Sequence, residues 1–462
     1  MVLRLLQQLE TKKASFDVPN VLYKEAGPWI AKPLSHLFSL SISQRHVPAI
    51  WKTGAVTPIP KVTKPTINDI RPISILPTPA KILEKIVLQG MEKFFSRNFD
   101  AQQFGFRSRS STLCALLYLE DCVTRLLDDA STAGVVIISY DLSKAFDKLP
   151  HEHILQRLMD LGFPTGFIEW TASYLHERKQ FVRYGEHCSN IADVTSGVPQ
   201  GSIIGPSLFV NTIGSYQGDT NNYHVIKYAD DTTLCIPIFK NDTNGSLQRI
   251  RQEHDRIMQW STAIGLPINP AKSKCLTIKK ISSCPQPEIP YLPVVDVLRI
   301  LGVTFNSKWN FNHHIDKISS ITSKRLYALR ILKPSLTTSE MINAYNSLVR
   351  SYFEYCAPLL LGLSQTNKRK LERIQRRFHN IICSKSCMEP CLISLQERRK
   401  LISLKFLHKV MRADHVLHHL LPPRMNSGRF RLPPRRTTQR SLAFFPNVCK
   451  AFNAEQTRSN KS

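Results

Sequence analysis

Two adjacent carboxylates, Asp230 and Asp231, stand in the segment Lys227-Tyr-Ala-Asp-Asp-Thr-Thr-Leu234. Apolar and β-branched residues flank the pair, a pattern that predicts two short strands joined by a tight acidic turn. Neighbouring carboxylates repel each other, so a buried pair stays ionised only beside a cation. Mg²⁺ suits such a site because it takes one or two protein carboxylates together with substrate phosphates. Taken alone, these residues favour an ordinary solvated Asp-Asp turn.

A third carboxylate changes that interpretation. The run Val135-Val-Ile-Ile138 is apolar and β-branched, and it leads through Ser-Tyr to Asp141, as expected for a buried strand that ends at an acid. Together with Asp230 and Asp231, this gives three carboxylates on two predicted strands. That is the inventory of a two-metal phosphoryl-transfer site.

The residues around these acids resemble a known family. Tyr228-Ala-Asp-Asp231 and Asp141-Leu-Ser-Lys-Ala-Phe-Asp147 resemble two signature motifs of reverse transcriptases, specifically those of non-LTR (LINE-like) retrotransposons. The resemblance covers about residues 20–310 well and the helical remainder more loosely. It implies an α+β right-hand polymerase with fingers, a palm that contains an antiparallel sheet, and a helical thumb. Six other segments also resemble the family and occur along the chain in the same order as in the family: 51–61, 70–77, 103–112, 197–209, 265–274 and 298–305.

The resemblance implies a role for each acid. Asp141 and Asp230 would bridge two Mg²⁺ ions, with Mn²⁺ as the alternative, and Asp231 would assist. One ion would activate the 3′-OH of a primer, and the other would stabilise the leaving pyrophosphate. Lys272 would act as general acid to the pyrophosphate, although Lys274 lies close enough in the chain to take that role.

Two cations are expected to face the triphosphate of the incoming deoxynucleotide. By resemblance these are Lys61 and Arg71, in the predicted fingers. A cationic clamp there would offset the charge on the transferred group. The alternative is that Arg71 simply pairs with the nearby Asp69.

Other residues are expected to contact the sugar and base. Phe146 stands five residues after Asp141, where the family places an aromatic ring that leaves no room for a 2′-hydroxyl. Phe146 therefore favours DNA synthesis, and a role as a core aromatic at a strand–helix junction is compatible with this. Gln200 can hydrogen-bond a base or sugar edge, and Gly201 permits a close approach of the backbone to a ligand.

The charge of the chain is unevenly distributed. The net charge is +27 over 462 residues. Residues 321–462 carry 27 Lys and Arg against 7 Asp and Glu, whereas residues 1–320 carry 35 and 28. This asymmetry predicts a polyanionic partner bound with salt-dependent affinity. With the resemblance, the expected partners are an RNA template, a DNA primer or target, and dNTPs; the plainer alternative is a basic soluble surface.

Composition and length bound the remaining possibilities. A hydrophobic content of 42% excludes wholesale disorder, and no segment has the unbroken apolar length of a membrane span. Eleven scattered cysteines suit reduced thiols in a nuclear or cytoplasmic protein, and the sequence does not choose between these compartments. Within the C-terminal part, residues 424–440 are expected to form a loosely ordered connector. The predicted division is an N-terminal helical extension, fingers and palm, a basic thumb and an Arg-rich tail: residues 1–40, 41–305, 306–422 and 423–462.

Several alternatives remain open at this stage. No endonuclease-like segment precedes the predicted polymerase, so we expect a truncated copy or part of a longer element protein, with endonuclease activity supplied from elsewhere. The competing class is a catalytically inactive remnant that only binds nucleic acid. An RNA-templated RNA polymerase is disfavoured by Phe146 and by Tyr228-Ala-Asp-Asp in place of Gly-Asp-Asp. A zinc site is also disfavoured, because its candidate ligands lack the spacing of a zinc knuckle: His379, Cys383, Cys387 and Cys391.

Overall fold

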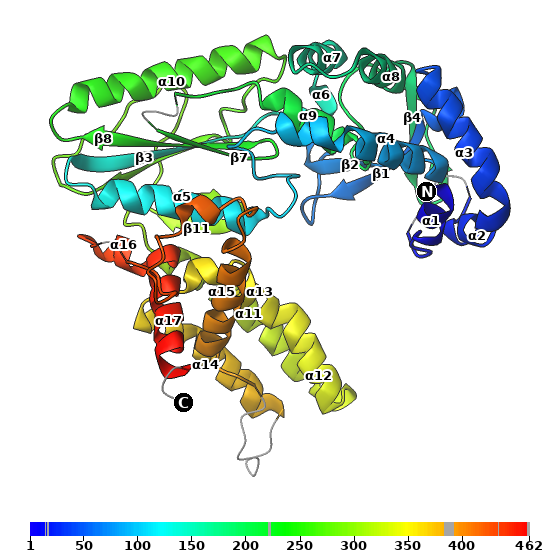
Figure 1. The fold of residues 1–462 in the computed structure, drawn as a ribbon. Coiled ribbons are helices and arrows are strands. Elements are labelled where there is room, and N and C mark those ends of the chain that lie inside the picture. The colour runs from blue at the N-terminus through cyan, green and yellow to red at the C-terminus, as the bar shows by residue number, and fades with distance from the viewer. Residues whose placement is uncertain (14, 16–17, 220–222, 383–391, 433, 460–462) are drawn as a thin grey trace. The chain divides into compact units, whose positions relative to one another are not determined.

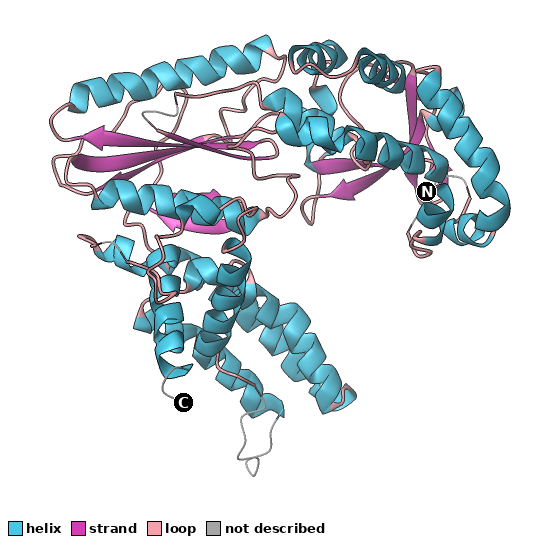
Figure 2. Cartoon of the chain, viewed as in Figure 1, coloured by secondary structure: helices cyan, strands magenta, loops and turns pink. Residues whose placement is uncertain are grey.

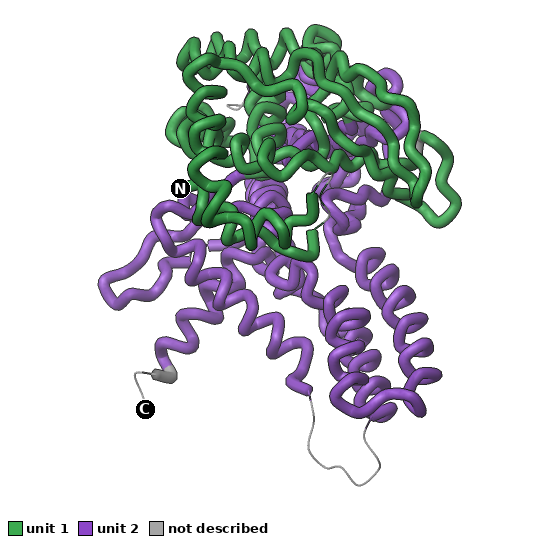
Figure 3. The backbone as a smooth tube through the Cα atoms, turned by 90° about the vertical axis from the view of Figure 1, so that its right-hand side faces the viewer, with its two compact units in different colours: residues 1–106, 142–217, 255–269 green, residues 107–141, 218–254, 270–462 purple. Residues whose placement is uncertain are grey.

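The computed structural model describes residues 1–462 except 14, 16–17, 220–222, 383–391, 433 and 460–462, and except the side chains of residues 68, 458 and 459. Cys383, Cys387 and Cys391 of the candidate zinc set therefore lie outside the described residues. The chain forms two compact units, each assembled from separate stretches (Figure 3). Unit 1 comprises residues 1–106, 142–217 and 255–269, and unit 2 comprises residues 107–141, 218–254 and 270–462. In the described part of the chain, no helix is both long and apolar enough to cross a membrane.

Unit 1 contains a mixed sheet with the strand order β2-β1-β4-β5, in which β6 also pairs with β4. β1 pairs antiparallel with β2 and parallel with β4. The prolines of β1 and β2 lie opposite each other, with Pro58 facing Pro72, at the end of the hairpin where the strands become exposed. The strands are β1 (Thr53–Pro60), β2 (Ile70–Ile75), β4 (Arg178–Tyr184), β5 (His187–Cys188) and β6 (Ala192–Val194).

Helices make up most of the rest of unit 1 (Figures 1 and 2). α4 begins just after Pro77 and has Pro79 in its first turn, where a missing amide hydrogen costs nothing. α4 is amphipathic, with Ile82, Leu83 and Val87 on its buried face. The helices are α1 (Val2–Gln7), α2 (Asn20–Glu25), α3 (Gly27–Ser43), α4 (Thr78–Arg97), α6 (Ala145–Lys148), α7 (His151–Asp160), α8 (Thr165–Leu175) and α9 (Gly205–Ile213).

The central sheet of unit 2 is antiparallel and has the strand order β7-β8-β3-β9. These strands are β7 (His224–Tyr228), β8 (Asp231–Phe239), β3 (Thr132–Tyr140) and β9 (Lys274–Lys279). Nearly every residue of β3 is buried, because α5 (Thr112–Asp128) covers one face of the sheet and the unit 2 part of α10 (Thr243–Ala263) lies along the other (Figure 1). The predicted buried strand and the predicted hairpin around the acidic turn are both confirmed.

The remainder of unit 2 begins with a small hairpin and continues as helices. The hairpin consists of β10 (Val297–Ile300) and β11 (Val303–Asn306). The core of the helical part includes Tyr345, whose ring stacks on that of Phe378 at 4.0 Å between centroids. Basic side chains lie on the exposed side of α14, as expected for a basic thumb: Arg369, Arg373, Arg376 and Arg377. The helices are α11 (Asn312–Leu332), α12 (Thr338–Tyr345), α13 (Ser351–Glu354), α14 (Gln365–Ile382) and α15 (Leu395–Val410).

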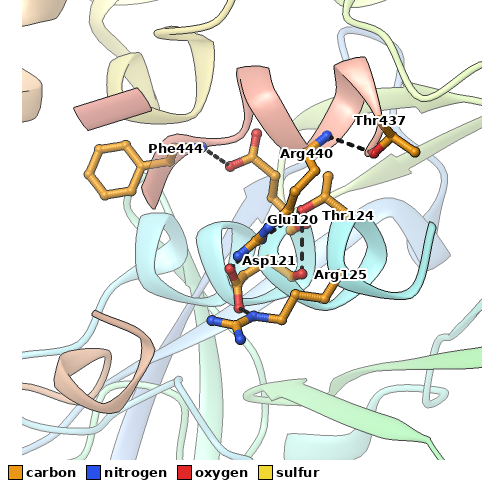
Figure 4. A network of polar contacts seen from close by, with 7 residues as sticks. All are labelled: Glu120, Asp121, Thr124, Arg125, Thr437, Arg440 and Phe444. Carbon is orange, nitrogen blue, oxygen red and sulfur yellow. Dashed lines mark hydrogen bonds and ion pairs between the residues drawn. The ribbon is translucent and has the colours of Figure 1, made fainter. Parts of the chain in front are cut away.

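The C-terminal segment differs from the loosely ordered connector expected at residues 424–440. Arg440 is only 6% exposed, and it lies in a docked segment that contains α16 (Thr438–Leu442) and α17 (Phe444–Ser459). Its guanidinium group lies 2.7 Å from Asp121 of α5, and the amide of Phe444 donates a hydrogen bond to Glu120 of the same helix (Figure 4). The Arg- and Pro-rich composition concealed this docking, because the acids that bind the segment lie more than 300 residues earlier in the chain.

Candidate active site

The acidic turn lies at the tip of the β7–β8 hairpin. Tyr228 pairs with Asp231, so Ala229 and Asp230 form a two-residue turn between the strands. Ala229 has φ 53°, a conformation that favours glycine and is common in tight hairpin turns. The turn therefore presents Asp230 at the tip and fixes Asp231 as the first residue of β8.

The third carboxylate reaches the same end of the sheet through β3. Tyr140 of β3 pairs with Thr232 of β8, so continuing the antiparallel register by one residue brings Asp141 opposite Asp231. Directly opposed residues of an antiparallel pair have Cβ atoms about 4.5–5.5 Å apart. The amide of Asp141 donates to the hydroxyl of Ser273 over 3.2 Å, which holds the end of the strand in place. All three acids belong to unit 2.

The electrostatics show that these carboxylates share one environment. Asp231 keeps an exposed edge at the start of β8, but the protein atoms packed around its carboxylate, followed by the charges of Asp230 and Asp141, raise its pKa to about 7. The ammonium group of Lys272 lies 3.5 Å from a carboxylate oxygen of Asp141. Lys272 is 63% exposed, so it can move with a bound phosphate group. The structure thus brings the four predicted catalytic residues together.

The carboxylates fit a hard divalent cation. Among the described residues, no group of three or more His, Cys, Asp or Glu side chains is already arranged closely enough to enclose an ion. Mg²⁺ needs no such cage, because it keeps several waters and binds one or two carboxylates plus substrate phosphates. A cation between these acids would also relieve the repulsion that raises the pKa of Asp231.

The candidate triphosphate residues belong to unit 1. Arg71 pairs with Ile59 in the β1–β2 hairpin, and Lys61 follows β1 directly. Both side chains are exposed. The carboxylate of Asp69 accepts hydrogen bonds from the amide and hydroxyl groups of Thr66 within its own turn. Both expected roles of Arg71, contact with the triphosphate and pairing with Asp69, stay predictions.

Phe146 is half-buried in unit 1. Its ring stacks on that of Phe209 in α9, with centroids 3.9 Å apart, and the ring of Phe106 meets it edge-on at 6.0 Å. Phe209 is fully buried, so Phe146 is held rigidly on a core aromatic while part of its ring stays accessible. A half-buried aromatic residue stacked on the core is compatible with both expected roles, the core aromatic and the steric barrier.

Gln200 and Gly201 lie in a loop that packs against β2 and against the Asp147 segment. The amide group of Gln200 donates to the carboxylate of Asp147 over 2.8 Å, and the backbone carbonyl of Gln200 accepts from the amide of Ser74 over 2.7 Å. Gly201 has φ 130°, and a Cβ atom there would lie 2.3 Å from the carbonyl oxygen of Ser74. The close approach that requires glycine is therefore to strand β2.

Two acids of unit 1, Asp147 and Glu84, support the loop that contains Gln200 and Gly201, and neither was expected from the sequence to belong to the site. Burial raises the pKa of Asp147, although Gln200, Lys144 and Lys61 all act in the opposite direction. Because the charge of Lys61 acts on Asp147, this acid lies near the candidate triphosphate lysine. The second acid is Glu84, and the signal that could have identified it is its place within the otherwise apolar stretch around Ile82, Leu83 and Val87.

Glu84 of α4 is 2% exposed. It accepts hydrogen bonds from the amides of Ile203 and Ile204 at 2.5 and 3.2 Å, and from the hydroxyl of Tyr174 at 3.0 Å. Burial raises the pKa of its carboxyl group. Glu84 thereby fixes the backbone between Gly201 and the start of α9, so this loop is held by a buried side chain from a distant helix.

Comparison with known proteins identifies the family. Residues 59–305 match the model of the reverse transcriptase (RNA-dependent DNA polymerase) family, which is more than half of the chain. The chain belongs to this family. The matched region contains every site residue described above, and the family implies the right-hand polymerase fold and the use of divalent metal ions.

Curated relatives place this reverse transcriptase among those of non-LTR retrotransposons. It is 25% identical over 364 residues to the "Probable RNA-directed DNA polymerase from transposon BS" of Drosophila melanogaster, covering 74% of this chain and 40% of that protein. It is also 25% identical over 361 residues to the "RNA-directed DNA polymerase from mobile element jockey" of the same species, covering 74% and 39%. The chain thus spans about two fifths of the length of these relatives.

Among solved structures, the apo telomerase of Candida tropicalis matches with a TM-score of 0.43 and 11% identity. The match covers 85% of this chain and 68% of that one. That likeness is too distant to add to the family assignment.

Proposed function

We propose that this reverse transcriptase copies RNA into DNA by adding deoxynucleotides to the 3′-OH of a primer. The observation that carries the proposal is the convergence of Asp141, Asp230 and Asp231 at one end of an antiparallel sheet, where burial and mutual repulsion raise the pKa of Asp231 to about 7. Carboxylates placed this close together repel each other, and a cation that binds between them would remove the repulsion and explain their arrangement.

Asp141, Asp230 and Asp231 would hold the metal, and Mg²⁺ is the ion proposed, with Mn²⁺ as the alternative. When bound, two such ions lower the pKa of an attacking hydroxyl group and neutralise the leaving oxygen in phosphoryl transfer. The turn at Ala229 and the end of β3 fix the positions of the acids. Lys272 supplies a proton to the leaving pyrophosphate from its position beside Asp141.

The residues of unit 1 select and orient the nucleotide in this proposal. Lys61 and Arg71 bind the triphosphate through their exposed cationic groups. Phe146, held on Phe209, excludes a 2′-hydroxyl. Gln200, whose amide nitrogen is bound to Asp147, presents its amide oxygen to the base or sugar edge.

The proposed partners are an RNA template, a DNA primer or target, and dNTPs, with no membrane involved. The exposed arginines of α14 suit contacts with the phosphates of an A-form-like duplex, which is recognised by shape and backbone. We assign residues 41–305 to fingers and palm, residues 306–422 to the thumb, and residues 1–40 and 423–462 to flanking segments.

Primer extension on an RNA template tests the proposal. The reactions contain Mg²⁺ and either dNTPs or rNTPs, and they compare the wild type with Asp230→Ala. Asp255→Ala is the matched control, because it removes the same charge from an exposed position of α10. Extension with dNTPs that is lost only in Asp230→Ala would support the proposal. Salt-sensitive duplex binding without extension by the wild type would overturn it in favour of a binding remnant.

A further inference from the structure

The tip of the β10–β11 hairpin is a two-residue turn in a left-handed conformation. Leu301 has φ 45° and Gly302 has φ 86°, as in the type I′ turns that connect twisted strands. The tip meets Tyr355, which directly follows α13. The next residue, Cys356, has φ 54°, and its bend starts a new helical turn at Ala357. Two uncommon backbone conformations therefore meet at Tyr355.

Tyr355 is bound to the hairpin tip through its hydroxyl group and its ring. The hydroxyl donates a hydrogen bond to the carbonyl oxygen of Leu301 over 2.7 Å. Burial raises the pKa of Tyr355, and the nearby side chain of Thr112, the first residue of α5, acts in the opposite direction. A Cβ atom at Gly302 would lie 3.2 Å from the Tyr355 ring, so glycine allows the ring to sit on the turn. Tyr355 thus connects the helical part to the hairpin, next to the start of α5.

The same tip forms a wall beside the candidate catalytic acids. A small cavity of about 40 Å³ is lined by Asp231 and Tyr228 from the β7–β8 hairpin and by Arg299, Ile300 and Leu301 from the β10–β11 hairpin. Leu301 therefore borders both the cavity beside Asp231 and the Tyr355 hydroxyl. A shift of the tip would change the surface next to the acids.

We propose that Tyr355 is a positioning residue that holds the β10–β11 tip beside the catalytic acids and so sets how tightly the primer end is bound. This inference rests on the proposed polymerase function. The tip and Tyr355 both lie in unit 2 with the three acids, whereas the candidate nucleotide-binding residues lie in unit 1. Loss of the contact therefore weakens the binding of the primer–template duplex and leaves the binding of dNTP unchanged.

The test compares Tyr355→Phe with Tyr327→Phe, which removes a hydroxyl from a ring of α11 that is 66% exposed. Fluorescence anisotropy gives the Kd of a labelled DNA-primed RNA template, and primer extension gives separate KM values for duplex and dNTP. For Tyr355→Phe we expect the duplex Kd and KM to rise about two- to tenfold, the range for one lost hydrogen bond, with the dNTP KM and kcat unchanged.

A second readout needs no catalysis. Hydrogen exchange of the free protein is followed in peptides that cover residues 298–304, for both variants and for Gly302→Ala, which adds a Cβ against the ring. We expect these peptides to exchange faster than in the wild type in Tyr355→Phe and Gly302→Ala, and at the wild-type rate in Tyr327→Phe. Unchanged exchange, or faster exchange without any change in duplex Kd, would overturn the positioning role. A wild type that binds duplex without extending primers would contradict the proposed function alone, because the anisotropy comparison would still decide the role of Tyr355.

Discussion

The docking of the C-terminal segment on α5 gives a prediction whose size follows from the structure. Arg440 is 6% exposed and Asp121 is 2% exposed; their side chains form an ion pair at 2.7 Å, and Arg440 also donates to the hydroxyl of Thr124 over 3.1 Å. The change Arg440→Met keeps an unbranched apolar stem and removes the cation. Asp121 would retain Arg125, which lies 2.6 Å away but is 54% exposed (Figure 4).

The expected cost is a lower free energy for opening of the segment that contains α16 and α17. Removing one partner of a buried ion pair destabilises a protein by about 3–5 kcal/mol, because the other charge stays buried. Since Arg125 still neutralises part of the charge on Asp121, we take the lower end, about 3 kcal/mol. At about 1.4 kcal/mol per tenfold change, amides that exchange through this opening should exchange about 100-fold faster.

Native-state hydrogen exchange measured by mass spectrometry is the assay, with peptides that cover residues 438–457. The matched control is Lys450→Met, which makes the same change of charge at an exposed position of α17. We expect fast exchange in Arg440→Met only. If the two variants exchange within about threefold of each other, the buried ion pair does not hold the segment in place.

Three further predictions concern pH, metal and sugar selection. Burial raises the pKa of Glu120 from 4.5 to about 8 in the folded protein. Between these two pH values the unfolded chain has lost the proton while the folded protein keeps it, so the free energy of unfolding falls as the pH rises towards 8. In Glu120→Gln the side-chain oxygen can still accept the hydrogen bond from the amide of Phe444. The Tm of this variant minus that of the wild type should therefore be larger at pH 8 than at pH 6. An equal difference at the two pH values would contradict this. Addition of Mg²⁺ should raise the Tm of the wild type more than that of Asp230→Asn, because the cation relieves repulsion with Asp231; equal shifts in both would argue against a metal between these acids. Phe146→Val should increase rNTP incorporation at least tenfold relative to dNTP incorporation in primer extension. Unchanged selectivity would show that Phe146 serves only as a core aromatic residue stacked on Phe209.

The sequence determined the local structure around the acids. A β-branched apolar run predicted β3, because such residues are stable as a strand whose two faces are both covered. The pair Asp230-Asp231 between two short apolar segments predicted the hairpin, since a tight turn is a local feature of a few residues.

Only the tertiary structure decided which distant segments meet. The strand pattern did not fix the register that brings Asp141 opposite Asp231, about ninety residues later in the chain. Periodicity likewise gave no partner for Glu84, which binds the backbone near Ile203. Composition at the C-terminus concealed the docking of Arg440 on Asp121. Hydrophobic patterning shows which face of an element is buried, whereas the partner of that face depends on packing and polar pairing across the whole chain.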